Sequence, residues 1–155
     1  MEYIYKIKSP LGVLTLSSDG AGISGLWIEG QRYFGYTLGG DAVECELPVF
    51  RDAAVWLDIY FSGKEPGFMP PLTPKGTPFR QSVWESIGRI PYGQTATYAS
   101  LAPHTSPRAV GGAVGHNPVS ILIPCHRVVG AGGKMTGYAA GIDKKILLLR
   151  LEGSR

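Results

Sequence analysis

The stretch SPRAVGGAVGHNP, residues 106–118, predicts a short helix with a defined beginning and end. Ser106 is a preferred N-cap residue, and Pro107 suits the first helical position, where no backbone N–H is needed. Pro118 ends the pattern, because the residue before a proline avoids helical backbone angles. Another short helix, TYASLA, begins near Thr97. The two helices with their tight turn resemble a helix-turn-helix.

The segment that follows, SILIPCHRVVG at 120–130, is an apolar run that carries the reactive residue types. Cys125 lies beside an imidazole and a guanidinium, and nearby positive charge favours a nucleophilic thiolate. In an extended segment Cys125 and His126 would point to opposite faces, so their contact would require either a bend at Pro124 or a bridging water. Glu152 could orient the imidazole of His126 in a Cys–His–Glu relay. The alternative is that Cys125 is an inert core cysteine.

Glycines inside the helix at 106–118 need a reason, since each costs about 1 kcal/mol relative to alanine. Ala109, Gly112 and Ala113 form a smooth face beside one long cation, Arg108. Such a face fits the close approach of a phosphate backbone. Close packing of a neighbouring helix would select the same small residues, and this alternative stays open.

The N-terminal half has the alternation of β-strands. EYIYKIK near the N-terminus, LGVLTLS at 11–17 and ISGLWIE at 23–29 predict an antiparallel meander. Residues 30–47 are glycine-rich and acidic and are interpreted as a loop. The remaining predicted elements are a helix over 48–63, a proline-rich linker over 64–78, a helix over 79–90 that buries Phe79 and Trp84, and a helix over 141–153 framed by Ile142, Ile146 and Leu149.

The charges are distributed unevenly along the chain. Residues 1–74 hold five basic and nine acidic side chains, whereas residues 75–155 hold ten basic and three acidic ones. A basic C-terminal half suits a polyanionic partner. Chance scatter of solvated charges would produce the same pattern.

Length and composition exclude several classes of protein. A chain of 155 residues with 44% hydrophobic residues can bury an enzyme core. Its two cysteines cannot make a disulfide framework or a four-cysteine zinc site. No apolar run is long enough for a signal sequence or a transmembrane helix, so we expect a cytoplasmic protein (nuclear in a eukaryote) without membrane contacts.

Four motifs, IPYGQTATYASLA, SPRAVGGAVGHNP, ILIPCHRVVG and TGYAAG, resemble the O6-alkylguanine-DNA alkyltransferases, the methylated-DNA–protein-cysteine methyltransferases. The resemblance covers about residues 78–153. It implies an α/β (α+β) fold with a ribonuclease-H-like domain over 1–72 and a winged helix-turn-helix-like alkyltransferase and DNA-binding domain over 73–155. Pro103 shortens the first helix of this motif relative to family members.

The resemblance also implies roles for individual residues. Cys125 would accept the alkyl group after activation by His126 and Glu152, with Arg127 as a structural partner. Tyr98 would protonate the departing guanine, and Asn117 would join the recognition helix to the cysteine segment. Arg108 would fill the space left by the extruded base. The helix residues at the DNA would be Ser106, Ala109, Gly111 and Gly112, and the pocket would be lined by Val128, Tyr138 and Ala139.

The implied activity is single-turnover repair of double-stranded DNA. The damaged nucleotide would be flipped out of the duplex, and its alkyl group, on O6 of guanine or on O4 of thymine, would pass irreversibly to the protein's own cysteine. The protein would act as a monomer and would need no cofactor and no metal. One alternative is a silent alkyltransferase-like protein that binds lesions without repairing them. Another is a cysteine hydrolase, for which the sequence offers no clear oxyanion hole.

Overall fold

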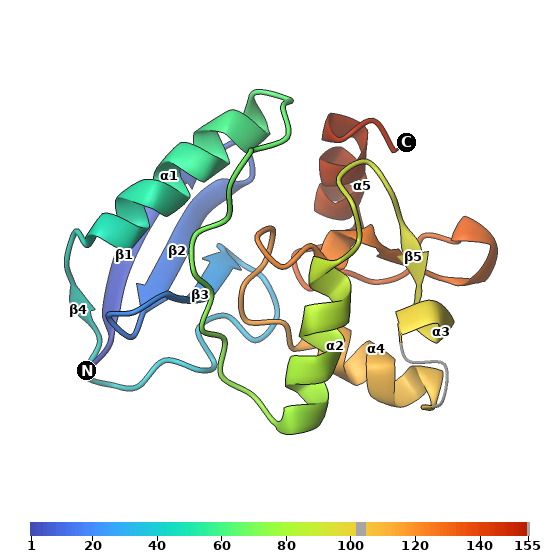
Figure 1. Ribbon diagram of the computed structural model, residues 1–155, viewed down its shortest axis with the longest axis horizontal. Coiled ribbons are helices and arrows are strands. Elements are labelled where there is room, and N and C mark those ends of the chain that lie inside the picture. Colours follow the sequence, from blue (N-terminus) through green and yellow to red (C-terminus); the bar gives the residue numbers. More distant parts are fainter. Residues whose placement is uncertain (102–104, 155) are drawn as a thin grey trace. The chain divides into compact units, whose positions relative to one another are not determined.

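The computed structural model describes residues 1–101 and 105–154. The chain forms two compact units (Figure 1), and each is described by itself. One comprises Met1–Lys75 with Pro118–Ser120, and the other comprises Gly76–Asn117 with Ile121–Arg155. The predicted helix end at Pro103 lies outside the described residues. Together the units make a mixed α/β protein.

The first unit is built on a four-stranded sheet in the order β3-β2-β1-β4. Strands β1 (Tyr3–Ser9), β2 (Gly12–Ser18) and β3 (Ile23–Ile28) form the predicted antiparallel meander. The acidic segment was expected to be a loop only, but its residues Val43–Glu44 form β4, parallel to β1. The N–H groups of Val43 and Cys45 donate to Glu2 and Ile4, so this segment satisfies carbonyls on the outer edge of β1.

Helix α1 (Pro48–Phe61) packs against the sheet of the first unit (Figure 1). Its Phe50 stacks on Tyr5 of β1 with ring centroids 5.8 Å apart. A segment from far along the chain also joins this unit. The N–H of Leu26 donates to Pro118 O at 2.8 Å, and Ser120 N donates to Leu26 O at 3.0 Å. Residues 118–120 are thus held on β3.

The second unit contains short helices and one pair of two-residue strands. Helix α2 begins after Thr77, whose hydroxyl caps Arg80 N, and α4 begins after Ser106, whose hydroxyl accepts from Ala109 N at 3.1 Å. The predicted N-cap is therefore confirmed. The elements are α2 (Pro78–Gly88), β5 (Ala96–Thr97), α3 (Tyr98–Leu101), α4 (Pro107–Gly115), the 3₁₀ helices η1 (Cys125–Arg127) and η2 (Ala131–Gly133), β6 (Val128–Val129), parallel to β5, and α5 (Ile142–Leu151).

Three expectations about the second unit are wrong. Phe79 is 39% exposed and Ile142 is 46% exposed, because each lies at the first turn of its helix, beyond the packed face. Ala113 is buried, and its carbonyl accepts from the Trp84 indole at 2.8 Å, so it belongs to the core and not to the open face of α4.

Among the described residues, the helices are all too short or too polar to cross a membrane.

Candidate active site

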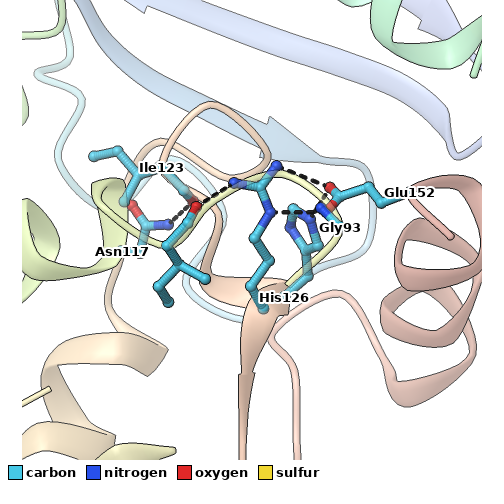
Figure 2. A network of polar contacts seen from close by, with 7 residues as sticks. Gly93, Asn117, Ile123, His126 and Glu152 are labelled. Carbon is cyan, nitrogen blue, oxygen red and sulfur yellow. Dashed lines mark hydrogen bonds and ion pairs between the residues drawn. The ribbon is translucent and has the colours of Figure 1, made fainter. Parts of the chain in front are cut away.

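A buried carboxylate organises the polar core of the second unit. Glu152 follows α5, and its side chain is fully buried. It accepts hydrogen bonds from His126 Nε2 at 2.6 Å, Arg127 Nε at 2.8 Å and Arg127 Nη2 at 3.1 Å. The N–H of Gly93 adds a fourth bond at 3.3 Å (Figure 2). The structure therefore brings together the predicted His126 and Glu152.

The turn that carries Gly93 fits closely against Glu152. Gly93 has φ of +80°, which side chains rarely adopt, and an added Cβ would lie 3.2 Å from the Glu152 carbonyl oxygen. Arg127 reaches the same turn, since its Nη1 donates to Ile90 O at 2.8 Å and its guanidinium lies 5.7 Å from the Tyr92 ring. Arg127 thus holds this turn against Glu152.

Cys125 is 5% exposed and begins η1. Burial raises the pKa of its thiol, and this effect outweighs a hydrogen bond from Asn117, the charge of Lys145 and a hydrogen bond from Tyr138, all of which lower it. The expected effect of neighbouring positive charge is present, because the charge of Lys145 favours the thiolate, but burial outweighs it. The guanidinium of Arg127 is paired with Glu152, so its charge is compensated.

His126 is completely buried, and burial lowers its pKa below 6.5 despite the hydrogen bond and charge of Glu152. Burial therefore favours the neutral imidazole, whereas the hydrogen bond and charge of Glu152 favour its protonated form. The segment was expected to be extended, but Cys125 and His126 lie in a 3₁₀ turn. Successive side chains of such a turn diverge by about 120°, since it has three residues per turn.

Asn117 fixes the backbone that leads into the cysteine segment. It is buried directly after α4, and its Nδ2 donates to Ile123 O at 2.8 Å (Figure 2). This bond closes the loop 118–122 across its ends. Together with its hydrogen bond to Cys125, it makes Asn117 a link between α4 and the thiol.

Lys145 is a site residue that the sequence analysis missed. It is 1% exposed, and its Nζ donates to Val128 O at 2.6 Å, with Thr136 O at 3.4 Å and Thr136 Oγ1 at 3.5 Å. Burial lowers the pKa of Lys145 to about 8. Helical spacing was the available signal, because a residue at 145 shares one face with Leu149 and Glu152.

The other predicted pocket residues lie around this lysine and the thiol. Tyr98, the first residue of α3, is half-buried, with its Oη 2.9 Å from Thr136 Oγ1. The Val128 carbonyl is already an acceptor for Lys145. Tyr138 lies close enough to Cys125 to lower the pKa of its thiol, and Ala139 is half-buried two residues before Gly141, the N-cap of α5.

Helix α4 presents an open face. Arg108, Ala109 and Gly112 are exposed, and Gly111 is half-buried. A Cβ added at Gly111 or Gly112 would meet no described atom within 4 Å outside the backbone of its own helix. Close packing inside this unit therefore does not explain these two glycines. Ser106 is exposed at the start of the same helix, as its N-cap.

No group of three His, Cys, Asp or Glu side chains that could hold a metal ion occurs in residues 1–101 and 105–154. The site consists of a buried thiol, a buried imidazole bound to a carboxylate, and a buried lysine. In a mixed α/β protein these residue types are those of a cysteine-dependent transferase or hydrolase.

Comparisons with known proteins narrow this class. The model of the family described as "6-O-methylguanine DNA methyltransferase, DNA binding domain" matches residues 78–154. A methylated-DNA–protein-cysteine methyltransferase of Methanosarcina acetivorans is 40% identical over 98% of this chain and 99% of its own length. Its counterpart from Methanosarcina barkeri is 43% identical over 94% of each chain. The crystal structure described as Mycobacterium tuberculosis OGT in complex with DNA matches with a TM-score of 0.87 at 40% identity, covering 98% of this chain and 93% of that one.

The chain belongs to the methylated-DNA–protein-cysteine methyltransferase family.

Proposed function

We propose that this protein repairs DNA by transferring an alkyl group from O6 of guanine irreversibly to its own Cys125, with O4-alkylthymine as a second substrate. The observation that supports this most is the buried Cys125 beside His126, which Glu152 holds at 2.6 Å, in a chain of this family. The thioether product has no bond that water readily cleaves. Each molecule therefore acts once, and no cofactor takes part.

His126 is the proposed acceptor of the thiol proton. Its Nε2 is bound to Glu152, so the proton reaches Nδ1 through a bridging water. Glu152 stabilises the imidazolium that forms. Burial raises the pKa of Cys125, so the thiol stays protonated until a substrate is in place, and this protects it from other electrophiles.

DNA is the proposed partner, and α4 is its proposed contact. The alkylated base lies inside a duplex, so the nucleotide must be flipped out at a cost of a few kcal/mol. Arg108 would fill the vacated space, while Ser106, Ala109, Gly111 and Gly112 would lie along the backbone in the minor groove. The open face of α4 supports this contact, as does the excess of basic residues after position 75.

The flipped guanine is proposed to enter a pocket next to Cys125. Tyr138 would form a wall, and the Val128 carbonyl with the backbone near Ala139 would recognise the base. A carbonyl has two lone pairs, so the bond from Lys145 leaves Val128 O with capacity for a base N–H. Asn117 would keep the cysteine segment in register with α4, and Tyr98 would protonate the departing guanine.

The finer description of the fold is proposed along with the function. Residues 1–72 would form a ribonuclease-H-like domain, and residues 73–155 would form a winged helix-turn-helix-like domain. The sheet covered by α1 supports the first, and the succession α3–α4 supports the second. We further propose that the protein acts as a monomer in the compartment that holds the DNA, the cytoplasm of a prokaryote or the nucleus of a eukaryote.

The test is the stoichiometry of transfer from a duplex oligonucleotide with one O6-methylguanine whose methyl group is labelled. We expect a single transfer per protein molecule, lost in Cys125→Ser and retained in the matched control Cys45→Ser, because Cys45 is an exposed thiol. Continued turnover would indicate a hydrolase instead. Binding of the duplex without transfer would indicate a silent lesion-binding protein.

A further inference from the structure

The backbone that leads from α4 to Cys125 contains a strained residue. Ile121 has a φ of +72°, in the left-handed region, although it is β-branched and only 1% exposed. Such a conformation is an outlier for a β-branched residue. A residue persists in it only where the surrounding structure imposes it. The contacts that impose it on Ile121 are made by the residues on either side of it in the sequence.

Ser120, directly before Ile121, is held on β3. Its N–H donates to Leu26 O at 3.0 Å. Its hydroxyl donates to Gln31 Oε1 at 3.3 Å, and the same oxygen accepts from Ile28 N at 2.7 Å. Gln31 is 7% exposed and Ser120 is 2% exposed, so water competes little for these bonds. One buried amide oxygen therefore joins the end of β3 to Ser120.

The backbone after Ile121 is held as closely. The carbonyl of Ile123 accepts from Asn117 Nδ2 at 2.8 Å (Figure 2) and from Cys125 N at 2.8 Å. Ile121 and Leu122 alone therefore separate two anchored residues, and of these two only Ile121 has a positive φ. This is the pattern of a type II′ turn, whose first central position usually holds glycine.

We propose that Gln31 and Ile121 are positioning residues for the alkyl transfer: Gln31 holds Ser120, and the strained turn that follows keeps Cys125 where its sulfur can attack. This inference rests on the proposed alkyl transfer and adds two residues that do not touch the reacting atoms. The sulfur must lie in line with the bond that breaks, and a misplacement of about 1 Å can slow a reaction about 10²-fold.

The choice of isoleucine at this position fits the proposal. Burial of the Ile121 side chain offsets the strain of its backbone, so the turn is stable without glycine as long as both anchors hold. Without the Gln31 amide, Ser120 would keep only its backbone bond to Leu26, and Ile121 would relax toward negative φ. Cys125 lies four residues further on, so such a rotation would displace its sulfur.

Gln31→Leu tests the anchor in single-turnover experiments. The rate at saturating duplex with O6-methylguanine reports on the thiol, and the dependence of the rate on duplex concentration gives the Kd for DNA. We expect Gln31→Leu to lower the saturated rate about 10-fold, to leave Kd unchanged, and to slow the reaction with free O6-benzylguanine equally. Tyr5→Leu, which loses the stacking on Phe50, is the control for destabilisation away from Ser120 and should keep the saturated rate.

Glycine and alanine at position 121 test the strain. Both truncate the same buried side chain, but only glycine adopts a φ of +72° freely. Gln31→Leu/Ile121→Gly should therefore react about 3-fold faster than Gln31→Leu/Ile121→Ala, because glycine keeps the turn without the anchor. If these truncated variants do not fold, Ser120→Ala gives an independent test, since it should slow the transfer in the wild type and add nothing in Gln31→Leu.

Three results would overturn the inference: slowing of the duplex reaction alone, equal slowing in Tyr5→Leu, or additive effects of Gln31→Leu and Ser120→Ala. The wild-type protein separates the inference from the function beneath it. If the wild type accepts a methyl group and Gln31→Leu reacts as fast, the positioning role is refuted and the alkyl transfer stands. If the wild type accepts no alkyl group from any substrate, both fail.

Discussion

Replacement of Glu152 by leucine should destabilise the protein severely, and a second substitution should reverse much of the loss. Glu152 accepts three hydrogen bonds from His126 and Arg127, at 2.6, 2.8 and 3.1 Å, and its side chain is fully buried. The Arg127 side chain is 9% exposed. Without Glu152 the guanidinium would remain in the core, where Ile90 O is the one other acceptor that it contacts among the described residues.

The magnitude follows from burial of this charge. Removing one member of a buried ion pair costs about 3–5 kcal/mol, since the other charge is left uncompensated. Typical domains have a free energy of unfolding of roughly 5–15 kcal/mol, so Glu152→Leu should remove a large part of it. Replacing both members by apolar residues of similar volume is often nearly neutral.

Urea unfolding followed by circular dichroism measures this effect for Glu152→Leu, Arg127→Met and the double variant. We expect each single variant to lose about 3 kcal/mol or more and the double variant to lose less than the sum by at least about 2 kcal/mol. The exposed pair Glu85 and Arg89, with side chains 71% and 73% exposed, is the control, and Glu85→Gln should change stability little. Additive losses in the double variant would refute the described coupling.

Three further outcomes are expected. Ser106→Ala should lower the free energy of unfolding by about 1 kcal/mol through loss of the N-cap of α4, and Ser106→Asp should not, as urea titration will show. The free energy of unfolding should fall as the pH drops below 6.5, because His126 binds a proton more readily in the unfolded chain than in the core. Unfolding curves taken between about pH 7.5 and pH 5.5 should show this fall in the wild type and much less of it in His126→Asn. Arg108→Ala should slow repair of a duplex about 10-fold, the equivalent of roughly 1.4 kcal/mol, while single-turnover rates with free benzylguanine stay the same; equal slowing of both would exclude the proposed insertion of Arg108.

Much of the fold was predictable because its signals are local. The alternation in 3–28 predicts the meander, and Ser106 with Pro107 marks the start of α4. The two-residue strand β4 was not predictable, since its pairing depends on the vacant edge of β1 and not on its own residues. Phe79 was assigned to the core by helical spacing, which cannot tell that the first turn of α2 lies beyond the packed surface.

In the candidate site, too, some features were predictable from the residue types and others depend on contacts that the sequence does not reveal. Contact between His126 and Glu152 was anticipated from residue types, but the 3₁₀ turn at Cys125 was not, because a proline in an apolar run allows several backbone courses. Lys145 was missed because lysine is rarely buried, so a lysine in a helix is assigned to the surface by default. Its burial became visible only in the structure, where its Nζ contacts Val128 O and Thr136 Oγ1.

The measurement that tests the central proposal most directly is peptide mapping after incubation with a duplex that carries O6-methylguanine. The chain supplies its own control, since Cys45 is exposed and Cys125 is buried. The account predicts a methyl group on the peptide that contains Cys125 and an unmodified Cys45. A bare Cys125, or methylation that follows exposure and appears on Cys45, would contradict it.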